Sequence, residues 1–269
     1  MDIGVSIRNM GAQSTRELMA GCARAAEEMD FESIWVTDHI AIPPDDAEGS
    51  GGRYLDTLTT LAWLAGITDR VKLGSGVLIL PYRAALPTAK QIATVQELSG
   101  NRLVLGVGIG WMDPEFRVLG VDRHARGRIS DETLAFINTC FAQDEVEANG
   151  QKFLFKPRPQ KPPILIGGRA PHALRRAAKY GDGWFPISRT PENLAASIQA
   201  YRDLTEAEGK PPGQITASAR LPLADRQQAR ELCDQYRELG VNRLVCGVRY
   251  DTLVEFRAGL EELAAIMLA

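Results

Sequence analysis

The chain has 269 residues, of which 45% are hydrophobic and 24% are charged, a composition typical of a globular protein with a sizeable core. The formal net charge of −3 gives no reason to expect nucleic acid or an anionic membrane as a partner. The first residues lack the basic start and apolar run of a signal peptide, and no apolar stretch approaches the roughly 18 residues of a membrane span. We therefore expect a soluble cytoplasmic protein. Its four scattered cysteines are expected to be buried thiols.

In the first half of the chain, short β-branched segments alternate with helical patterns. Strands are expected at 3–7, 33–36, 71–79 and 103–107. The first helix is expected to begin after Ser14 or Thr15, which would cap it. Further helices are expected over 55–65, over 92–98 before Gly100, and over 131–141. The apolar face of the third of these four helices is expected to include Leu98.

The second half continues the alternation after a polar stretch, 145–155, that predicts a small hairpin or an extended insert. Strands are expected at 164–166, 183–187, 215–219 and 244–248. Helices are expected at 173–179, 192–208, 226–239 and 251–267. Eight strand–helix units with apolar strands predict an α/β fold, a (β/α)₈ TIM barrel that forms a single domain over 1–269. A doubly wound open sheet is the alternative.

A barrel of this kind places its active site where the strands end, because the strand-to-helix loops converge there. Asp38 and His39 follow the second strand, and a carboxylate beside an imidazole can orient the ring or hold a proton. The alternative is that Asp38 caps a loop and His39 merely packs. The chain has three histidines, and the position of His39 at a strand end favours the functional interpretation.

Glycines gather at the ends of the third, fourth and fifth strands. They either leave room for a flat group or pack the barrel, and packing is the preferred interpretation for Gly106. The spacing G-V-G-I-G at 106–110 is not that of a dinucleotide-binding fingerprint. Gly167, Gly168 and Arg169 precede a predicted helix with Pro171 in its first turn, which favours a phosphate site as much as ordinary capping. Arg189, Arg220 and Arg249 would lie on the same rim.

Two other classes of barrel enzyme lack their residues here. A metal-dependent hydrolase needs several converging histidines or carboxylates, and His124 and His172 fall in helices or loops, so we expect no metal site. A Schiff-base aldolase needs a lysine at the carboxyl end of a strand, whereas Lys72 lies at the opposite end. A cofactor-dependent reaction remains.

Several motifs, in this order along nearly the whole chain, resemble the luciferase-like monooxygenase superfamily. They are F-E-S-I-W-V-T-D-H at 31–39, G-S-G-V at 74–77, R-L-V-L-G-V-G-I-G-W at 102–111, P-I-L-I-G-G at 163–168 and Y-G-D-G-W at 180–184. The T-D-H and G-W features are most similar to the branch that uses the deazaflavin coenzyme F420, while other branches use FMN. Where some deazaflavin dehydrogenases carry a glutamate acid after the fourth strand, this chain has Trp111, and Glu115, four residues further on, is the candidate to replace that acid.

The resemblance implies a (deaza)flavin across the strand ends, with His39 and Asp38 as catalytic residues and a cis peptide bond between Gly76 and Val77. The residues implied in cofactor binding are Asp38, Ser75, Gly76, Val77, Gly108, Gly110, Trp111, Gly167, Gly168, Arg169 and Ser188. The implied reaction is hydride transfer between F420 and a small organic substrate, in a homodimer. The alternative enzyme is an FMN monooxygenase that uses O₂ and reduced flavin from a partner reductase.

Two further alternatives are a flavin carrier without turnover and an isomerase that binds a phosphosugar at Gly167 and Gly168. The long loop 42–54, rich in proline and glycine, is expected either to cover the site as a substrate lid or to be a surface loop.

Overall fold

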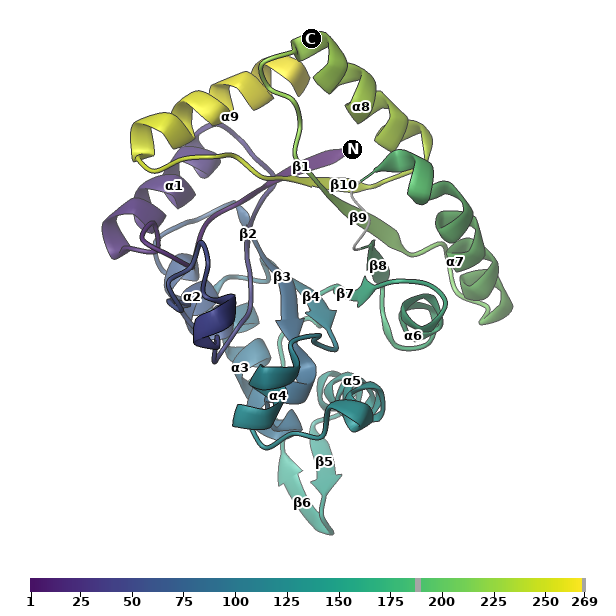
Figure 1. The fold of residues 1–269 in the computed structure, drawn as a ribbon. Coiled ribbons are helices and arrows are strands. Elements are labelled where there is room, and N and C mark those ends of the chain that lie inside the picture. The colour runs from purple at the N-terminus through teal and green to yellow at the C-terminus, as the bar shows by residue number, and fades with distance from the viewer. Residues whose placement is uncertain (187–189, 268–269) are drawn as a thin grey trace.

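The strands of the chain close into a parallel barrel with helices outside it, as Figure 1 shows. The computed structural model describes residues 1–186 and 190–267. In those residues eight strands follow one another around the barrel in the order β1-β10-β9-β8-β7-β4-β3-β2. Their bounds are β1 Asp2–Ser6, β2 Ser33–Val36, β3 Lys72–Ile79, β4 Leu103–Gly108, β7 Ile164–Gly168, β8 Gly183–Pro186, β9 Gln214–Ala219 and β10 Arg243–Cys246. The predicted TIM barrel is confirmed, and the open sheet is excluded.

The helices surround the strands and alternate with them along the chain (Figure 1). Their bounds are α1 Arg16–Glu28, α2 Thr57–Ala65, α3 Ala85–Leu98, α4 Asp113–Val118, α5 Arg126–Ala142, α6 His172–Tyr180, α7 Ala195–Ala207, α8 Arg226–Glu238 and α9 Leu253–Met267. The Thr15 hydroxyl caps α1 by accepting a hydrogen bond from the Leu18 amide, as its position in the sequence predicted. Leu98 does not belong to the buried face of α3, since it is 67% exposed at the last turn.

A few predicted boundaries are wrong. The helix expected at 131–141 begins earlier, at Arg126, and the one expected at 192–208 begins at Ala195 after a single 3₁₀ turn. The short helix α4 was not predicted. The predicted hairpin is present. It consists of β5 (Glu145–Ala148) and β6 (Gln151–Leu154), and it projects from the barrel (Figure 1). Ile187, the last residue of the sixth predicted strand, lies outside the described residues.

The interior of the barrel is filled by large side chains that leave the strand ends open. Trp35, Val104, Leu165, Phe185 and Val245 form one buried cluster, in which the Trp35 and Phe185 rings meet edge to face at 5.4 Å. This layer closes the barrel beneath the strand ends, so a ligand can enter only from above it.

Two glycines make this interior packing possible. A Cβ at Gly74 would lie 2.3 Å from the Trp35 ring, and a Cβ at Gly106 would lie 2.1 Å from the Ser75 carbonyl oxygen. Gly106 is therefore a packing glycine, as expected, and Gly74 is a second one.

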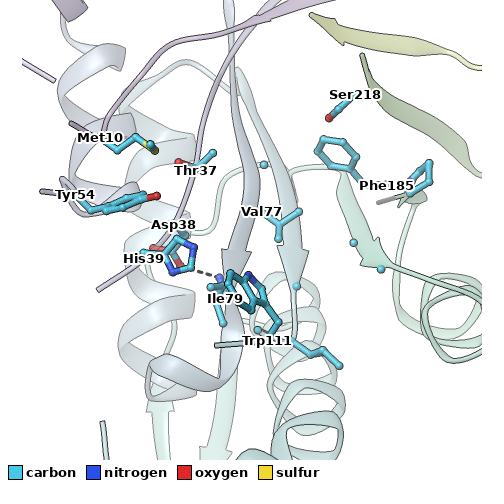
Figure 2. Close-up of a pocket in the computed structure, with 17 residues that line it drawn as sticks. Met10, Thr37, Asp38, His39, Tyr54, Val77, Ile79, Trp111, Phe185 and Ser218 are labelled. Atoms are coloured by element: carbon cyan, nitrogen blue, oxygen red, sulfur yellow. Dashed lines mark hydrogen bonds between the residues drawn. The ribbon is translucent and has the colours of Figure 1, made fainter. Parts of the chain in front are cut away.

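The third strand changes its pairing near its carboxyl end. Its register against β4 shifts between Ser75 and Leu78, and the peptide bond between Gly76 and Val77 is cis, as the family resemblance implies. This bulge turns Val77 toward the strand ends, where it lies in the middle of the view in Figure 2.

All four cysteines, Cys22, Cys140, Cys233 and Cys246, are free and buried, which confirms their prediction as buried thiols. No helix within the described residues is both long enough and apolar enough to cross a membrane.

Candidate active site

A cavity of about 370 Å³ lies at the carboxyl ends of the strands, within the size range of small-molecule sites, roughly 300–1,000 Å³. Figure 2 shows Tyr54, Met10 and His39 on one side of it and Phe185 and Ser218 on the other. The complete lining consists of Met10, Thr37, Asp38, His39, Tyr54, Gly76, Val77, Ile79, Gly108, Ile109, Gly110, Trp111, Gly167, Gly168, Phe185, Pro186 and Ser218. The barrel end that sequence reasoning selected thus carries a built cavity.

His39 follows β2 and is held by a carboxylate from a distant helix. Its Nδ1 lies 2.8 Å from Oε2 of Glu115, which belongs to α4. The other carboxylate oxygen, Oε1, accepts hydrogen bonds from the backbone amides of Ile40 and Ala41, the two residues that follow His39. Glu115 therefore fixes both the imidazole ring and the backbone that carries it.

The charge of Glu115 follows from these contacts. Burial of the side chain raises its pKa. The hydrogen bonds from His39 and the two amides outweigh this effect and lower the pKa of Glu115 to about 2. An ionised Glu115 can only accept, so Nδ1 of His39 is the protonated ring nitrogen. Nε2 is the ring nitrogen that Glu115 does not engage.

The Asp38 carboxylate does not pair with the neighbouring His39 but with Arg83. The carboxylate is buried and receives both guanidinium nitrogens of Arg83, at 2.6 and 2.8 Å. The Ile79 amide and the Thr57 hydroxyl donate to it as well, at 2.8 and 2.9 Å. The sequence suggested that the Asp38 carboxylate orients the His39 ring. In the structure the ring is hydrogen-bonded to Glu115 instead. Asp38 ties β2 to the end of β3.

Two aromatic rings stand against His39. Tyr54 meets the imidazole edge to face at 5.1 Å between ring centroids, and Trp111 meets it at 6.2 Å. Trp111 is 64% exposed at the cavity mouth. The imidazole is thus confined between two rings and a carboxylate, with 14% of its side chain accessible.

Glycines of β4 and β7 form part of the cavity wall. A Cβ at Gly108 would lie 2.6 Å from the Val77 side chain, and a Cβ at Gly167 would lie 2.9 Å from it. Larger residues at these two positions would displace Val77 into the cavity. The largely apolar cavity, with Val77 and Phe185 in its lining, is of a kind that accepts a flat heterocycle, so its residues fit a flavin-like ring.

A second hollow of about 400 Å³ adjoins the cavity at the ends of β7 and β8. Gly168 and Pro186 line both spaces, and Arg169, Asn193 and Ser197 line the hollow. Helix α6 begins only at His172, after a cis bond between Ala170 and Pro171, so Pro171 is the residue before the helix and not part of its first turn. A phosphate site here stays a prediction.

The structure places most predicted site residues around the cavity. Asp38, His39, Gly76, Val77, Gly108, Gly110, Trp111, Gly167 and Gly168 line it, and Arg169 lines the adjoining hollow. Ser75 does not line it: its buried hydroxyl donates to the Gly106 carbonyl at 2.8 Å. Ser188 and Arg189 lie outside the described residues.

Sequence reasoning missed other residues of the site. The sequence did not indicate Arg83, and it indicated Glu115 only as a replacement for the glutamate acid of some deazaflavin dehydrogenases, not as the partner of His39. Phe185 and Ser218 lie on predicted strands, so position alone could have indicated them. Tyr54 could not be found this way, since a bridge between Met10 and Tyr54 brings it in from the long loop.

The loop 42–54 is tied down at its end. Besides the bridge at Tyr54, Arg53 donates to the Ser14 hydroxyl at 2.8 Å and to the Ser14 carbonyl at 3.1 Å. Within the loop, Pro44–Asp46 forms a 3₁₀ turn. Whether the loop acts as a lid stays a prediction.

Comparison with known proteins finds one family along nearly the whole chain: the family described as luciferase-like monooxygenase matches residues 2–267. An uncharacterized protein of Mycobacterium tuberculosis is 33% identical over 206 residues, which are 70% of this chain and 71% of that protein. Among solved structures, the monooxygenase RslO1 from Streptomyces bottropensis superposes with a TM-score of 0.83 at 20% identity and covers 100% and 99% of the two chains. An F420-dependent secondary alcohol dehydrogenase in complex with an F420-acetone adduct gives 0.82 at 15% identity, with 98% of both chains covered. At these sequence identities the two superpositions support the fold alone.

Proposed function

The chain belongs to the luciferase-like monooxygenase family, and on that premise we propose that it transfers a hydride between coenzyme F420 and a small organic substrate. The observation that carries the proposal is the His39–Glu115 pair in the wall of an otherwise largely apolar cavity at the strand ends. The T-D-H motif that contains His39 supports F420 as the cofactor, because it is most similar to the branch of the family that uses F420.

The described residues suit the two ends of such a cofactor. Val77, Phe185 and the glycine wall of Gly108 and Gly167 would bind its flat ring. The hollow beside Arg169 would take its phosphate, because a guanidinium donates well to an oxyanion. When bound, the deazaflavin supplies a ring carbon that accepts or donates a hydride.

His39 would handle the proton that accompanies the hydride. With Nδ1 hydrogen-bonded to Glu115, Nε2 can take a proton from an alcohol or return one to a carbonyl oxygen. The nearby negative charge of Glu115 stabilises the ring when both nitrogens carry protons. Glu115 is therefore a positioning and charge-stabilising residue, and His39 is the proposed acid and base.

Asp38 would serve the site through the backbone. Arg83, Thr57 and the Ile79 amide hold its carboxylate in place. Asp38 would thereby fix the backbone at the end of β2 and the position of His39, the next residue. Tyr54 and Trp111 would exclude water from the ring and restrict its motion. These roles need no proton transfer by Asp38.

The alternative is a monooxygenase that uses O₂ and reduced FMN from a partner reductase. The description of the family as luciferase-like monooxygenase supports this alternative. The cavity, the hollow beside Arg169 and His39 could also hold FMN, since both cofactors combine a flat ring with a phosphate.

A parallel titration with F420 and FMN tests the proposal. Purified protein is expected to quench F420 fluorescence saturably and to bind FMN at least tenfold more weakly. A His39→Gln variant should bind F420 within about threefold of the wild type and lose turnover of secondary alcohols. Tighter binding of FMN, together with product formation that requires O₂, would overturn the F420 proposal in favour of the alternative.

A further inference from the structure

A third hollow, of about 690 Å³, opens beside the active-site cavity and, among the described residues, does not share lining residues with the hollow at Arg169. It shares four lining residues with that cavity, so the two spaces adjoin: Met10, Thr37, Gly76 and Ser218. The hollow lies at the ends of β1, β9 and β10, which are neighbours in the barrel. We call it the arginine hollow, after the residues that line it.

Three arginines line the arginine hollow, one from each of these strands. Arg8 follows β1, Arg220 follows β9 and Arg249 follows β10. Because β9, β10 and β1 are consecutive in the barrel, the three side chains leave the sheet next to one another. A Cβ at Gly247 would lie 3.6 Å from the Arg220 side chain, so that side chain lies along the end of β10.

The charge of the arginine hollow is not balanced by ion pairs. Among residues 1–186 and 190–267, no carboxylate lies within ion-pair distance of Arg8, Arg220 or Arg249, whereas Arg83 and Arg243 are each bound to carboxylates. Arg8 donates to the Gly49 carbonyl at 3.2 Å. The acidic residue of the lining, Asp251, accepts a hydrogen bond from the Gln13 amide.

We propose that the arginine hollow binds an oxyanion of the substrate, a carboxylate, sulfonate or phosphate, while the reacting carbon lies beside His39. This inference rests on the proposed function and names its substrate class: a small organic anion. Guanidinium groups bind such oxyanions in bidentate fashion, and three of them favour an anion over any neutral group. The adjoining spaces let one molecule reach from the arginines to His39.

The cofactor is the other source of anionic groups. Its phosphate is proposed to bind at Arg169, in the separate hollow at the ends of β7 and β8, which leaves the arginine hollow to the substrate. The oligoglutamate tail of F420 also carries carboxylates, and it makes a different prediction: binding of the cofactor itself would then depend on the arginines. The two sources are therefore separable by experiment.

The first measurement needs no cofactor. Inorganic sulfate is titrated calorimetrically into Arg169→Gln protein, in which the hollow at the ends of β7 and β8 has lost its own arginine. We expect saturable binding that weakens at least tenfold when Arg220→Gln and Arg249→Gln are added. The matched control is Arg24→Gln, an exposed position on α1, which removes one charge elsewhere and should change affinity less than twofold. If sulfate binding does not saturate, or if all variants bind sulfate with equal affinity, the proposal of an anion site is wrong.

The second measurement separates substrate from cofactor. F420 with and without its glutamate tail is titrated against the wild type and against Arg220→Gln/Arg249→Gln protein, and all four affinities are expected to agree within threefold. A loss confined to tailed F420 would assign the arginines to the cofactor and overturn the proposal. If neither form binds the wild type, the proposed function fails, whereas the sulfate result still decides whether the anion site exists.

Discussion

The imidazole Nδ1 of His39 and the carboxylate Oε2 of Glu115 lie 2.8 Å apart, although 76 positions separate the two residues. The pair joins the loop after β2 to the short helix α4 after β4. Since Oε1 of the same carboxylate holds the Ile40 and Ala41 amides, Glu115 fixes the His39 ring by one hydrogen bond and the backbone that follows it by two more.

Glu115→Gln keeps the size of the side chain and removes its charge. We expect turnover to fall on the order of 100-fold, because the protonated imidazole loses its stabilising carboxylate, while F420 affinity changes less than threefold. Steady-state kinetics with direct cofactor titration checks this. Full activity of the variant would show that the hydrogen bond, and not the charge, is what His39 requires.

The same residue predicts how stability responds to acid. The pKa of Glu115 is about 2 in the folded chain against an ordinary 4.5, so its contribution is present above pH 4.5 and is lost as the pH falls toward 2. Between pH 5 and 2 the wild type should lose about 3 kcal/mol more unfolding free energy than Glu115→Gln. Urea unfolding at several pH values measures the difference. Parallel curves for the two proteins would contradict it.

His39→Ala removes the proposed proton carrier. Turnover should fall by about 10²- to 10⁴-fold, the usual contribution of a positioned acid or base, and cofactor binding should persist. A Tyr54→Phe variant is the matched control, since it keeps the ring against His39 and alters only the hydroxyl. Comparable losses in both variants would remove His39 from its special role.

Arg83→Met is expected to destabilise the fold by about 3–5 kcal/mol, because it leaves the buried Asp38 carboxylate without its ionic partner. Thermal and urea unfolding provide the measurement. Arg128→Met breaks an exposed pair with Glu132 and should cost less than about 1 kcal/mol. Adding Asp38→Asn to Arg83→Met should recover part of the loss, and failure to do so would mean that packing of Arg83, not its charge, matters.

Gly74→Ala tests the barrel interior. The new Cβ would meet three atoms of the Trp35 ring at 2.3 to 2.5 Å, so the ring must move, and we expect a cost of about 2–3 kcal/mol or more. Gly66→Ala is the control: it follows α2 with a φ of −78° and meets only the Trp63 carbonyl at 3.5 Å. Near-equal stabilities of the two variants would show that Trp35 can relax without penalty.

The barrel could be predicted because each strand and helix carries its own local pattern. The position of His39 followed from the same logic, since it needs only the end of β2. Its partner did not, because Glu115 depends on where a helix of six residues folds back, and such a short helix has too few turns to show a periodic face.

Arg83 could not be predicted as the partner of Asp38 for a related reason. It follows the 3₁₀ turn Leu80–Tyr82 and reaches Asp38 only because β3 lies beside β2 in the barrel. The pairing of Asp38 with His39 along the chain was misleading for the same reason: neighbours in sequence at a strand end need not be partners. Leu98 shows the limit of periodicity at helix ends, where the last turn extends beyond the core.

The buried cysteines have a practical consequence for the laboratory. Burial raises the pKa of Cys22 to about 12 and of Cys140 to about 11, and it raises those of Cys233 and Cys246 as well, so none of the four is a ready nucleophile. A cysteine introduced at the exposed Trp111 position would therefore react with maleimide dyes far faster than the native thiols. The wild-type background is thus already suited to single-site fluorescent labelling at the mouth of the cavity.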